Sequence, residues 1–311
     1  MPTAPLPVRN GLNPTRLQLP TGGHWRTVLD YLNQRFPDDR VRLAEKVAAG
    51  DVVDGTGQRL REGSPFDPGS FVYLYRDPPV ETHVPFAIDI LHRDENLLVV
   101  DKPHFLASTP RGVHVVESAL VRLRCQLELP ELSPVHRLDR VTAGVLVFTV
   151  RTEVRGPYQG LFDQRRVRKV YEATAAHDPA LAFPRTVRSR IVKQRGVLAA
   201  QQVPGPANSE THVELLDVRG AVAGYRLSPA TGKTHQLRVH MNALGVPIVN
   251  DNFYPRVYDV AIDDYSAPLQ LLARSIAFTD PLSGADRSFV SKRQLGTVSR
   301  ADRTKRCPTG Y

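Results

Sequence analysis

The sequence has few of the residues that build cross-linked or metal-dependent proteins. Its 311 residues include two cysteines, Cys125 and Cys307, which lie far apart and form no C-x-x-C pair. We therefore expect neither a disulfide framework nor a structural zinc site. The chain also lacks an apolar run of about 18 residues, the length that a membrane-spanning helix needs. Its first 20 residues lack the apolar core of a secretory signal, so we expect a cytoplasmic protein without membrane contact.

Positive charge is what the chain has in excess. Lysine and arginine number 41 against 32 aspartate and glutamate residues, which gives a formal net charge of +9. A basic surface attracts polyanions, because neutralisation of phosphates dominates the affinity of proteins for nucleic acids. Charge alone leaves open whether the chain binds nucleic acid or is only a soluble basic protein.

Two short amphipathic helices are predicted after a leader. Residues 1–20 are rich in proline and small polar residues, which indicates a flexible leader. Apolar residues recur at helical spacing over 27–36 and again over 41–49, where a glycine ends the pattern. Strand-like pieces follow before Asp77-Pro78-Pro79, which indicates a linker. We therefore expect a small module over residues 21–79.

The main part of the chain, residues 80–290, alternates strand-like and polar segments with few helices. This pattern predicts an α+β domain with a mixed, largely antiparallel central sheet, not a doubly wound parallel sheet. The basic residues 291–311 indicate a mobile tail and a candidate RNA contact. The expected strands cover 97–100, 145–150, 170–175, 212–218 and 225–228, and the expected helices cover 153–162 and 236–244.

A charged segment before a buried-looking strand is the first candidate site. It reads PVHRLDRVTAG over residues 134–144 and leads into the strand VLVFTV. Asp139 lies between Arg137 and Arg140, and neighbouring guanidinium groups favour an ionised carboxylate. Charge clusters on surfaces are common, but an ionised carboxylate at the start of a strand is a candidate reactive group.

A second segment, PATGKTHQLRVHM over residues 229–241, predicts a turn followed by a helix. Lys233 and His235 would lie at the helix N-terminus, where backbone N–H groups favour anions. The spacing of a phosphate-binding P-loop is absent. His235 and His240 are five residues apart and do not share a helix face as a pair of zinc ligands would. We expect no metal site here.

A third segment, RRVRKVYEA over residues 165–173, carries basic residues into a strand. Tyr171 and Ala173 would share one face of that strand, and Glu172 would take the other. A tyrosine in a strand is usually a core or cross-strand residue. Its alternative role is to stack on a nucleic-acid base and to move a proton through its hydroxyl group.

Together, these three segments resemble the RluA family of RNA pseudouridine synthases. The resemblance runs from about Pro85 to Pro281 and includes NLLVVDKP as an opening strand and LQLLARSIAFTDP as a closing strand. Three positions depart from the usual family pattern. Ala143 stands for a common Ser, Leu272 for a common His, and Asn250-Asp251-Asn252 for a usual Gly-Asp pair.

The N-terminal module has a resemblance of its own. The phrase AAGDVVDGTGQRLREGSPFDPGSFVYLY is similar to the second half of the alpha-L RNA-binding motif, a small fold shared with a ribosomal protein. The second helix is less basic here than is usual for the motif, because Glu45 accompanies Arg40, Arg42 and Lys46.

The family resemblance implies an isomerase that detaches uracil from ribose, rotates it and rejoins it through carbon, without a cofactor. It implies that Asp139 is the catalytic carboxylate and Arg238 its partner. It also implies that Tyr171 stacks on uracil and is a candidate for removing the proton at the carbon of the new bond. Asp139 either attacks the sugar or removes a sugar proton, and both routes stay open. The base must first be flipped out of its stack. The implied substrate contacts are Arg137, Leu271, His235, Lys233, Gln236, Arg165, Lys169 and Lys102, the last of which is alternatively a solvated charge, and His136 is expected to be structural.

The expected partner is RNA, with large-subunit rRNA favoured over tRNA, and the expected state is a monomer without a nucleotide cofactor. One alternative is a non-catalytic RNA-binding or ribosome-assembly protein on the same scaffold, which would bind RNA without isomerising it. Another is a nucleoside glycosidase, which would release free uracil and would not need a basic RNA-binding module.

Overall fold

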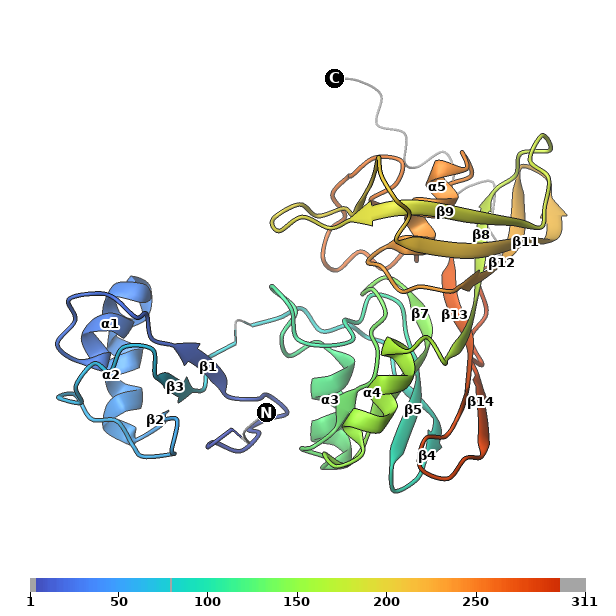
Figure 1. Ribbon diagram of the computed structural model, residues 1–311. Helices are drawn as coiled ribbons and strands as arrows, with labels where there is room; N and C mark the ends of the chain where they lie inside the picture. The colour runs from blue at the N-terminus through green and yellow to red at the C-terminus, as the bar shows by residue number, and fades with distance from the viewer. Residues whose placement is uncertain (1–3, 79, 297–311) are drawn as a thin grey trace, which may run out of the picture. The chain divides into compact units, whose positions relative to one another are not determined.

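The computed structural model describes residues 4–78 and 80–296 (Figure 1). The chain divides into two compact units near residue 80, and residues 121–130 belong to the smaller, N-terminal unit. The expected boundary after residue 79 lies beside this division. One residue of the expected linker, Pro79, lies outside the described residues.

The smaller unit packs two helices against a three-stranded antiparallel sheet of order β1-β3-β2. Thr27 caps the first helix through a capping box with Asp30, and Gly50 ends the second helix with a φ of 74°. Both predicted helices are confirmed. The predicted flexible leader is wrong for residues 15–18, which pair with β3. The elements are β1 (Thr15–Gln18), α1 (Val28–Arg35), the 3-10 helix η1 (Pro37–Asp39), α2 (Arg40–Ala49), β2 (Val52–Asp54) and β3 (Phe71–Leu74).

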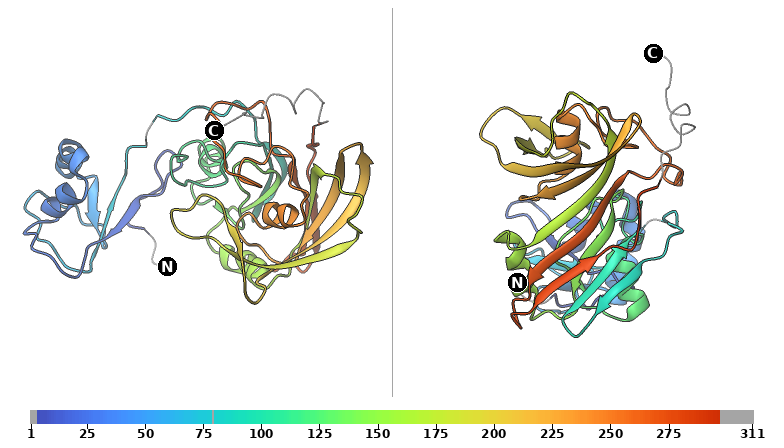
Figure 2. Two further views of the ribbon diagram at one scale, coloured as in Figure 1. Left: turned by 90° about the horizontal axis from the view of Figure 1, so that it is seen from above. Right: turned by 90° about the vertical axis from the view of Figure 1, so that its right-hand side faces the viewer.

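The larger unit is built on an 11-stranded sheet that is mixed and largely antiparallel, as predicted. Its order is β10-β9-β11-β12-β8-β13-β7-β5-β4, with β6 beside β7 and β14 beside β13. The neighbouring strands β13 and β14 are the orange-red and red arrows in Figures 1 and 2. The elements are β4 (Asp89–Arg93), β5 (Leu97–Lys102), β6 (Ser133–Pro134), β7 (Ala143–Thr149), α4 (Arg155–Asp163), β8 (Arg168–Ala176), β9 (Arg185–Val192), β10 (Gln201–Val203), β11 (Ser209–Arg219), β12 (Val222–Pro229), α5 (Gln236–Ala243), β13 (Leu271–Thr279) and β14 (Asp286–Val290). The remaining helix, α3 (Ala119–Leu127), falls mostly within the segment 121–130 that belongs to the smaller unit.

Two helices cover different parts of this sheet with separate hydrophobic clusters. In α4, Tyr158 and Leu161 pack against β5, β7 and β13. In α5, Leu237 and Met241 pack against β8, β11 and β12. Burying one such side chain stabilises the fold by about 1.5–3 kcal/mol. These contacts fix the helix axis of α5, which leaves its polar side chains in defined positions.

The strands from β10 to β13 join the strands β7, β5 and β4 where β13 pairs with β7 in parallel register. Leu272 pairs with Ala143, and Ala273 pairs with Gly144. Gly144 has a φ of 113°, and a Cβ there would lie 2.2 Å from the Ala273 carbonyl oxygen, so the close approach requires glycine. Two departures from the family pattern, Ala143 and Leu272, are therefore register partners, and both are fully buried. An apolar residue replaces a polar one on each side of the same pair.

The start of the predicted C-terminal tail is folded. The Lys292 amide donates to the Asp101 carboxylate at 2.7 Å, and the Arg293 guanidinium binds Asp89 at 2.8 Å. The prediction of a mobile tail is therefore wrong for its first residues, and residues 297–311 lie outside the described residues.

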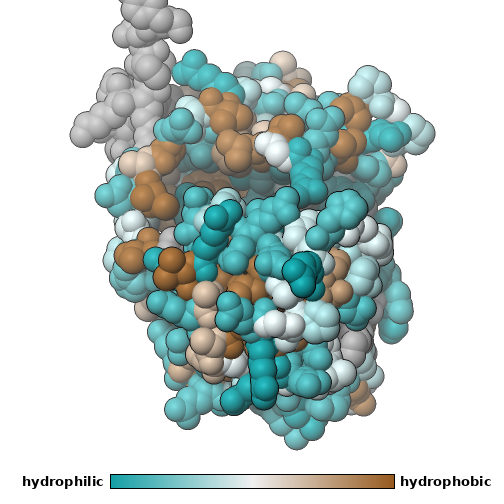
Figure 3. Space-filling view, turned by 90° about the vertical axis from the view of Figure 1, so that its left-hand side faces the viewer, coloured by the Kyte–Doolittle hydropathy of each residue, from teal (hydrophilic) through white to brown (hydrophobic). Residues whose placement is uncertain are grey.

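The part of the surface drawn in Figure 3 is mostly hydrophilic, and its hydrophobic side chains occur in small groups. Within residues 4–78 and 80–296, no helix is both long enough and apolar enough to cross a membrane.

Candidate active site

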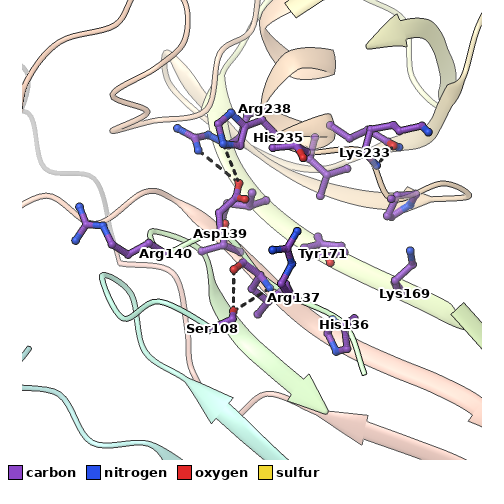
Figure 4. Close-up of a pocket in the computed structure, with 18 of the residues that line it drawn as sticks. Ser108, His136, Arg137, Asp139, Arg140, Lys169, Tyr171, Lys233, His235 and Arg238 are labelled. Carbon is purple, nitrogen blue, oxygen red and sulfur yellow. Dashed lines mark hydrogen bonds and ion pairs between the residues drawn. The ribbon is translucent and has the colours of Figure 1, made fainter. Parts of the chain in front are cut away.

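A polar cavity of about 850 Å³ lies beside the junction of β7 and β13 in the larger unit (Figure 4). Arginine and lysine side chains outnumber carboxylates on its wall, so the cavity suits an anionic ligand. Every predicted site residue except Lys102 lines it. These residues are Asp139, Tyr171, Arg238, Arg137, Leu271, His235, Lys233, Gln236, Arg165 and Lys169.

Asp139 faces the cavity from the loop between β6 and β7, and 30% of its side chain is exposed. Its Oδ2 atom lies 3.5 Å from Arg238 Nη1 and 4.0 Å from His235 Nε2, as the dashed lines in Figure 4 show. Both partners come from the N-terminal end of α5. The predicted pairing of Asp139 with Arg238 across 99 positions of sequence is thus present in the structure.

A second carboxylate fixes Arg238. Its Nε and Nη2 atoms donate to Asp251 at 2.8 and 2.6 Å, and the two side chains are 2% and 0% exposed. Burial by itself lowers the pKa of Arg238, but the hydrogen bonds and charge of Asp251 outweigh it, so the pKa is raised. The Phe253 ring lies 4.9 Å from the guanidinium carbon. The guanidinium therefore stays charged, with Nη1 turned to Asp139.

The loop that carries Asp139 is anchored by the segment after β5. Ser108 Oγ donates to the Leu138 carbonyl at 2.8 Å and accepts from the Leu138 amide at 3.0 Å. His104 Nδ1 donates to the Val141 carbonyl at 2.7 Å. The backbone on both sides of Asp139 is thereby held in place.

Lys102 anchors the same loop and is not a substrate contact. The predictions of a phosphate contact and of a solvated charge are both wrong, because the residue is fully buried. Its Nζ atom donates to the carbonyl oxygens of Pro103 and Leu106 at 2.8 Å and to that of Arg140 at 3.2 Å. Burial lowers the pKa of the ammonium group well below its usual value.

His136 has the structural role predicted for it. Its Nε2 atom accepts from the Val147 amide at 3.2 Å, and its ring stacks on Phe162 with centroids 4.9 Å apart. Burial lowers its pKa to about 3, so the ring is neutral at pH 7.

Tyr171 and Lys169 occupy alternate positions of β8 and line the cavity (Figure 4). Leu271 from β13 lines it as well. Burial, with a smaller contribution from the charge of Asp139, raises the pKa of the Tyr171 phenol. Burial lowers the pKa of the Lys169 ammonium. Within the described part of the chain, the Lys169 side chain forms no hydrogen bond or ion pair, so its charge is available to a ligand.

Gln236 lines the cavity, and its side chain also holds the turn before α5. Its Oε1 atom accepts from Thr231 Oγ1 at 2.7 Å and from the Lys233 amide at 3.0 Å. Its Nε2 atom donates to the Glu210 carbonyl and to Thr211 Oγ1, both at 2.9 Å. Each polar atom of the amide already has a protein partner. Gln236 therefore positions Lys233 at the cavity.

The remaining predicted cations stand at the edge of the cavity. Arg137, Arg165 and Lys233 are exposed, and all three line it. Among the described residues, the Arg137 side chain has no hydrogen bond or ion pair. Their positive charges are therefore available to an anionic ligand.

Sequence reasoning missed four residues that support the site. They are Asp251, which clamps Arg238, Phe253, which packs on it, and Ser108 and His104, which anchor the loop of Asp139. Only Asp251 left a signal, because it retains the acidic member of the usual Gly-Asp pair.

Comparisons with known proteins agree with this geometry. The family described as RNA pseudouridylate synthase matches residues 96–243. The chain is 31% identical to the dual-specificity RNA pseudouridine synthase RluA of Salmonella typhi, over 68% of this chain and 94% of that protein. It is 32% identical to the ribosomal large subunit pseudouridine synthase D of Xylella fastidiosa, over 76% of this chain and 73% of that protein.

A solved structure agrees as well. Human RNA pseudouridylate synthase domain containing 4 superposes with a TM-score of 0.53 at 27% identity, over 67% of this chain and 88% of that one. The predicted fold class and family are confirmed, and the chain belongs to the RluA-type RNA pseudouridine synthases, which are isomerases.

Proposed function

We propose that this chain converts specific uridines of structured RNA into pseudouridine, as a cytoplasmic monomer, with Asp139 as the catalytic carboxylate. One observation carries the proposal. Asp139 is open to a cation-lined cavity on one side and held on the other by Arg238, which Asp251 clamps in turn. A carboxylate that is oriented by a fixed partner and accessible from the cavity is what cleavage at an anomeric carbon needs.

The target uridine enters the cavity by leaving its base stack. Unstacking costs a few kcal/mol, which contacts between phosphates and the cations of the cavity edge offset. Tyr171 stacks on the extruded uracil, Leu271 borders it, and Arg137 occupies the space that the base has left. The cavity of about 850 Å³ has room for one nucleotide.

Two routes are open to Asp139 once the sugar is in place. The carboxylate either attacks the anomeric carbon and forms a covalent intermediate, or removes a sugar proton to give a glycal. In both routes Arg238 holds the carboxylate in its orientation toward the sugar.

Large-subunit rRNA is the substrate that we favour, with tRNA as the alternative. One relative is named for the large ribosomal subunit and another is named as having dual specificity. We also propose that the N-terminal module of residues 21–79 contacts RNA, as its resemblance to the alpha-L motif implies.

The test is chemical mapping of pseudouridine in total RNA. Cells with the chain, cells without it, and cells with only Asp139→Asn are compared. We expect a pseudouridine that is present in the first and absent from the other two, and its position names the substrate. Identical maps in the first two would contradict the proposed activity and favour a non-catalytic RNA-binding protein. Restoration of the site by Asp139→Asn would contradict the role of Asp139.

A further inference from the structure

His235 stands beside Asp139 in an unusual backbone conformation. Its φ is 57°, a left-handed value that few residues other than glycine adopt, directly before α5. The side chain is 10% exposed, and Nε2 lies 4.0 Å from Asp139 Oδ2. Two groups that can accept protons therefore face the same part of the cavity (Figure 4).

Two contacts decide which ring nitrogen carries the proton. Tyr254 Oη donates its single proton to the Ala200 carbonyl at 2.7 Å. The same oxygen therefore accepts from His235 Nδ1 at 3.1 Å, so Nδ1 is the protonated nitrogen. The Ala200 backbone N–H also points toward Nδ1 as a donor, but its distance of 3.5 Å is the longest of the three contacts, so the Tyr254 contact decides the assignment. Nε2 is left with a lone pair beside Asp139.

The surroundings of the ring keep it neutral and ready to accept a proton. Burial lowers the pKa of His235, and the charge of Asp139 partly opposes this effect. Charged groups on α5, on the loop after α5 and on the segment after β9 shift the pKa of His235 by smaller amounts. The groups responsible are Arg238 and Lys193, which lower the pKa, and Asp251, which raises it.

The phenol of Tyr171 is the competing proton acceptor in the cavity, and it is poorly suited to the task. A phenol accepts a proton only after it has lost its own. Burial and the charge of Asp139 both raise the pKa of Tyr171, so it remains protonated at neutral pH. His235 needs no prior ionisation, because a neutral imidazole already carries a lone pair.

Resting on the proposed function, we propose that His235 Nε2 is the general base that removes the proton from uracil C5. The step follows formation of the bond between C5 and the anomeric carbon, when C5 carries both the sugar and its hydrogen. Nε2 takes the hydrogen as a proton, the C5–H electron pair becomes the C5=C6 double bond, and the C6=N1 pair moves to N1. The imidazolium then returns a proton to N1, directly or through water. The net change is one proton moved from C5 to N1.

The test uses a transcript of the RNA that the mapping identifies, made with either ordinary or 5-deuterated uridine. His235→Asn is the variant of choice, because asparagine tolerates the left-handed backbone and its amide is not a base. We expect its single-turnover rate to fall by about 10²–10⁴-fold, the usual contribution of a general base. The deuterium isotope effect on pseudouridine formation should exceed that of the wild-type chain, because proton removal becomes the slowest step.

Two further variants separate this role from a structural one. Tyr171→Phe should lower the rate without increasing the isotope effect. If the isotope effect increases in Tyr171→Phe and not in His235→Asn, the phenol is the base. His240→Gln perturbs the same helix away from the cavity and should leave the isotope effect unchanged. An increase in that variant would mean that any disturbance of α5 has this consequence, and the inference would fail.

The outcome also distinguishes the inference from the proposed function. A wild-type chain that forms no pseudouridine in the transcript contradicts both. An active wild-type chain with an equally active His235→Asn variant contradicts only the role of His235.

Discussion

The two sides of α5 hold polar side chains in opposite ways. On the side of the sheet, His240 Nε2 contacts Ser189 Oγ at 3.0 Å and Ser209 Oγ at 3.1 Å, and Nδ1 contacts Thr211 Oγ1 at 2.9 Å. His240 is fully buried, and both ring nitrogens have partners. On the side of the cavity, Asp139 has two cationic or polar neighbours and is 30% exposed. We call the His240 network closed, because its groups are paired within the protein, and the Asp139 network open, because Asp139 remains accessible to a ligand.

Within one short helix, the residues on one side therefore fix the structure, and the residues on the other side contact the group that we propose as catalytic. A buried polar network in which every group is paired stabilises one geometry and offers nothing to a ligand. An open network keeps hydrogen-bonding capacity that only a substrate can complete. We therefore expect changes on the cavity side to act mainly on catalysis and changes on the sheet side to act mainly on stability.

The largest expected effect is the loss of activity in Asp139→Asn. The variant keeps the shape of the side chain and removes its charge, so we expect the single-turnover rate to fall by at least about 10³-fold. The free energy of unfolding should change by less than about 1 kcal/mol, because the Asp139 contact with Arg238 is long and part-exposed. A strongly destabilised variant would show that the open network also carries the fold, and the contrast between the two sides would not hold.

Asp251→Ala tests the buried ion pair between Asp251 and Arg238 on the cavity side. It leaves the Arg238 guanidinium buried without its bidentate partner, so we expect a loss of about 3–5 kcal/mol in the free energy of unfolding. Urea denaturation measures the loss. The control is Asp217→Ala, which breaks an ion pair with Arg219 whose side chains are 50% and 49% exposed and should cost less than about 1 kcal/mol. Equal losses in both variants would contradict the buried clamp.

The sequence predicted the parts of the site that local patterns encode. The strands β5 and β7 contain apolar runs bounded by polar residues, and the loop that carries Asp139 stands directly before β7. The pairing of Asp139 with Arg238 came from the family resemblance rather than from any local pattern. The residue that clamps Arg238 was missed because a partner 13 positions away becomes a contact only after the intervening loop has folded.

The errors have a common physical cause. Lys102 was expected at the surface because lysine is rarely buried, but three carbonyl oxygens replace its hydration. The leader was expected to be flexible from its proline content, although Leu17 and Leu19 pack in the core of the smaller unit. In each case the tertiary environment overrides the average behaviour of the residue type.

His240→Gln tests the closed network. Glutamine does not reproduce the contacts of both ring nitrogens, so hydroxyl groups of the network lose a buried partner. We expect the free energy of unfolding at pH 7 to fall by about 1–3 kcal/mol. The single-turnover rate per folded molecule should remain near that of the wild-type chain, because His240 does not line the cavity. A selective loss of activity without a loss of stability would contradict the division between the two sides.

The same variant has a signature in the dependence of stability on pH. Burial lowers the pKa of His240 from 6.5 to about 4 in the folded state. Between these values only the unfolded state takes up the proton, so the free energy of unfolding falls as pH drops, by up to about 1.4 kcal/mol per pH unit. At pH 7 both states are neutral and no penalty arises. Urea denaturation from pH 7 to pH 4.5 should show a shallower decline in His240→Gln, and an unchanged slope would mean that the ring is not held neutral.

The smallest expected effect concerns a single cation at the edge of the open side. Arg165→Gln removes one candidate phosphate contact, so the slope of the logarithm of RNA affinity against the logarithm of salt concentration should become shallower by about 0.7–0.9. Binding measured at several salt concentrations gives this slope. The matched control is Arg226→Gln on β12, whose side chain pairs with Glu214 and does not line the cavity, and its slope should match that of the wild-type chain. If the two variants change the slope equally, RNA is attracted by net charge alone. The arrangement of cations around Asp139 would then contribute nothing specific to binding.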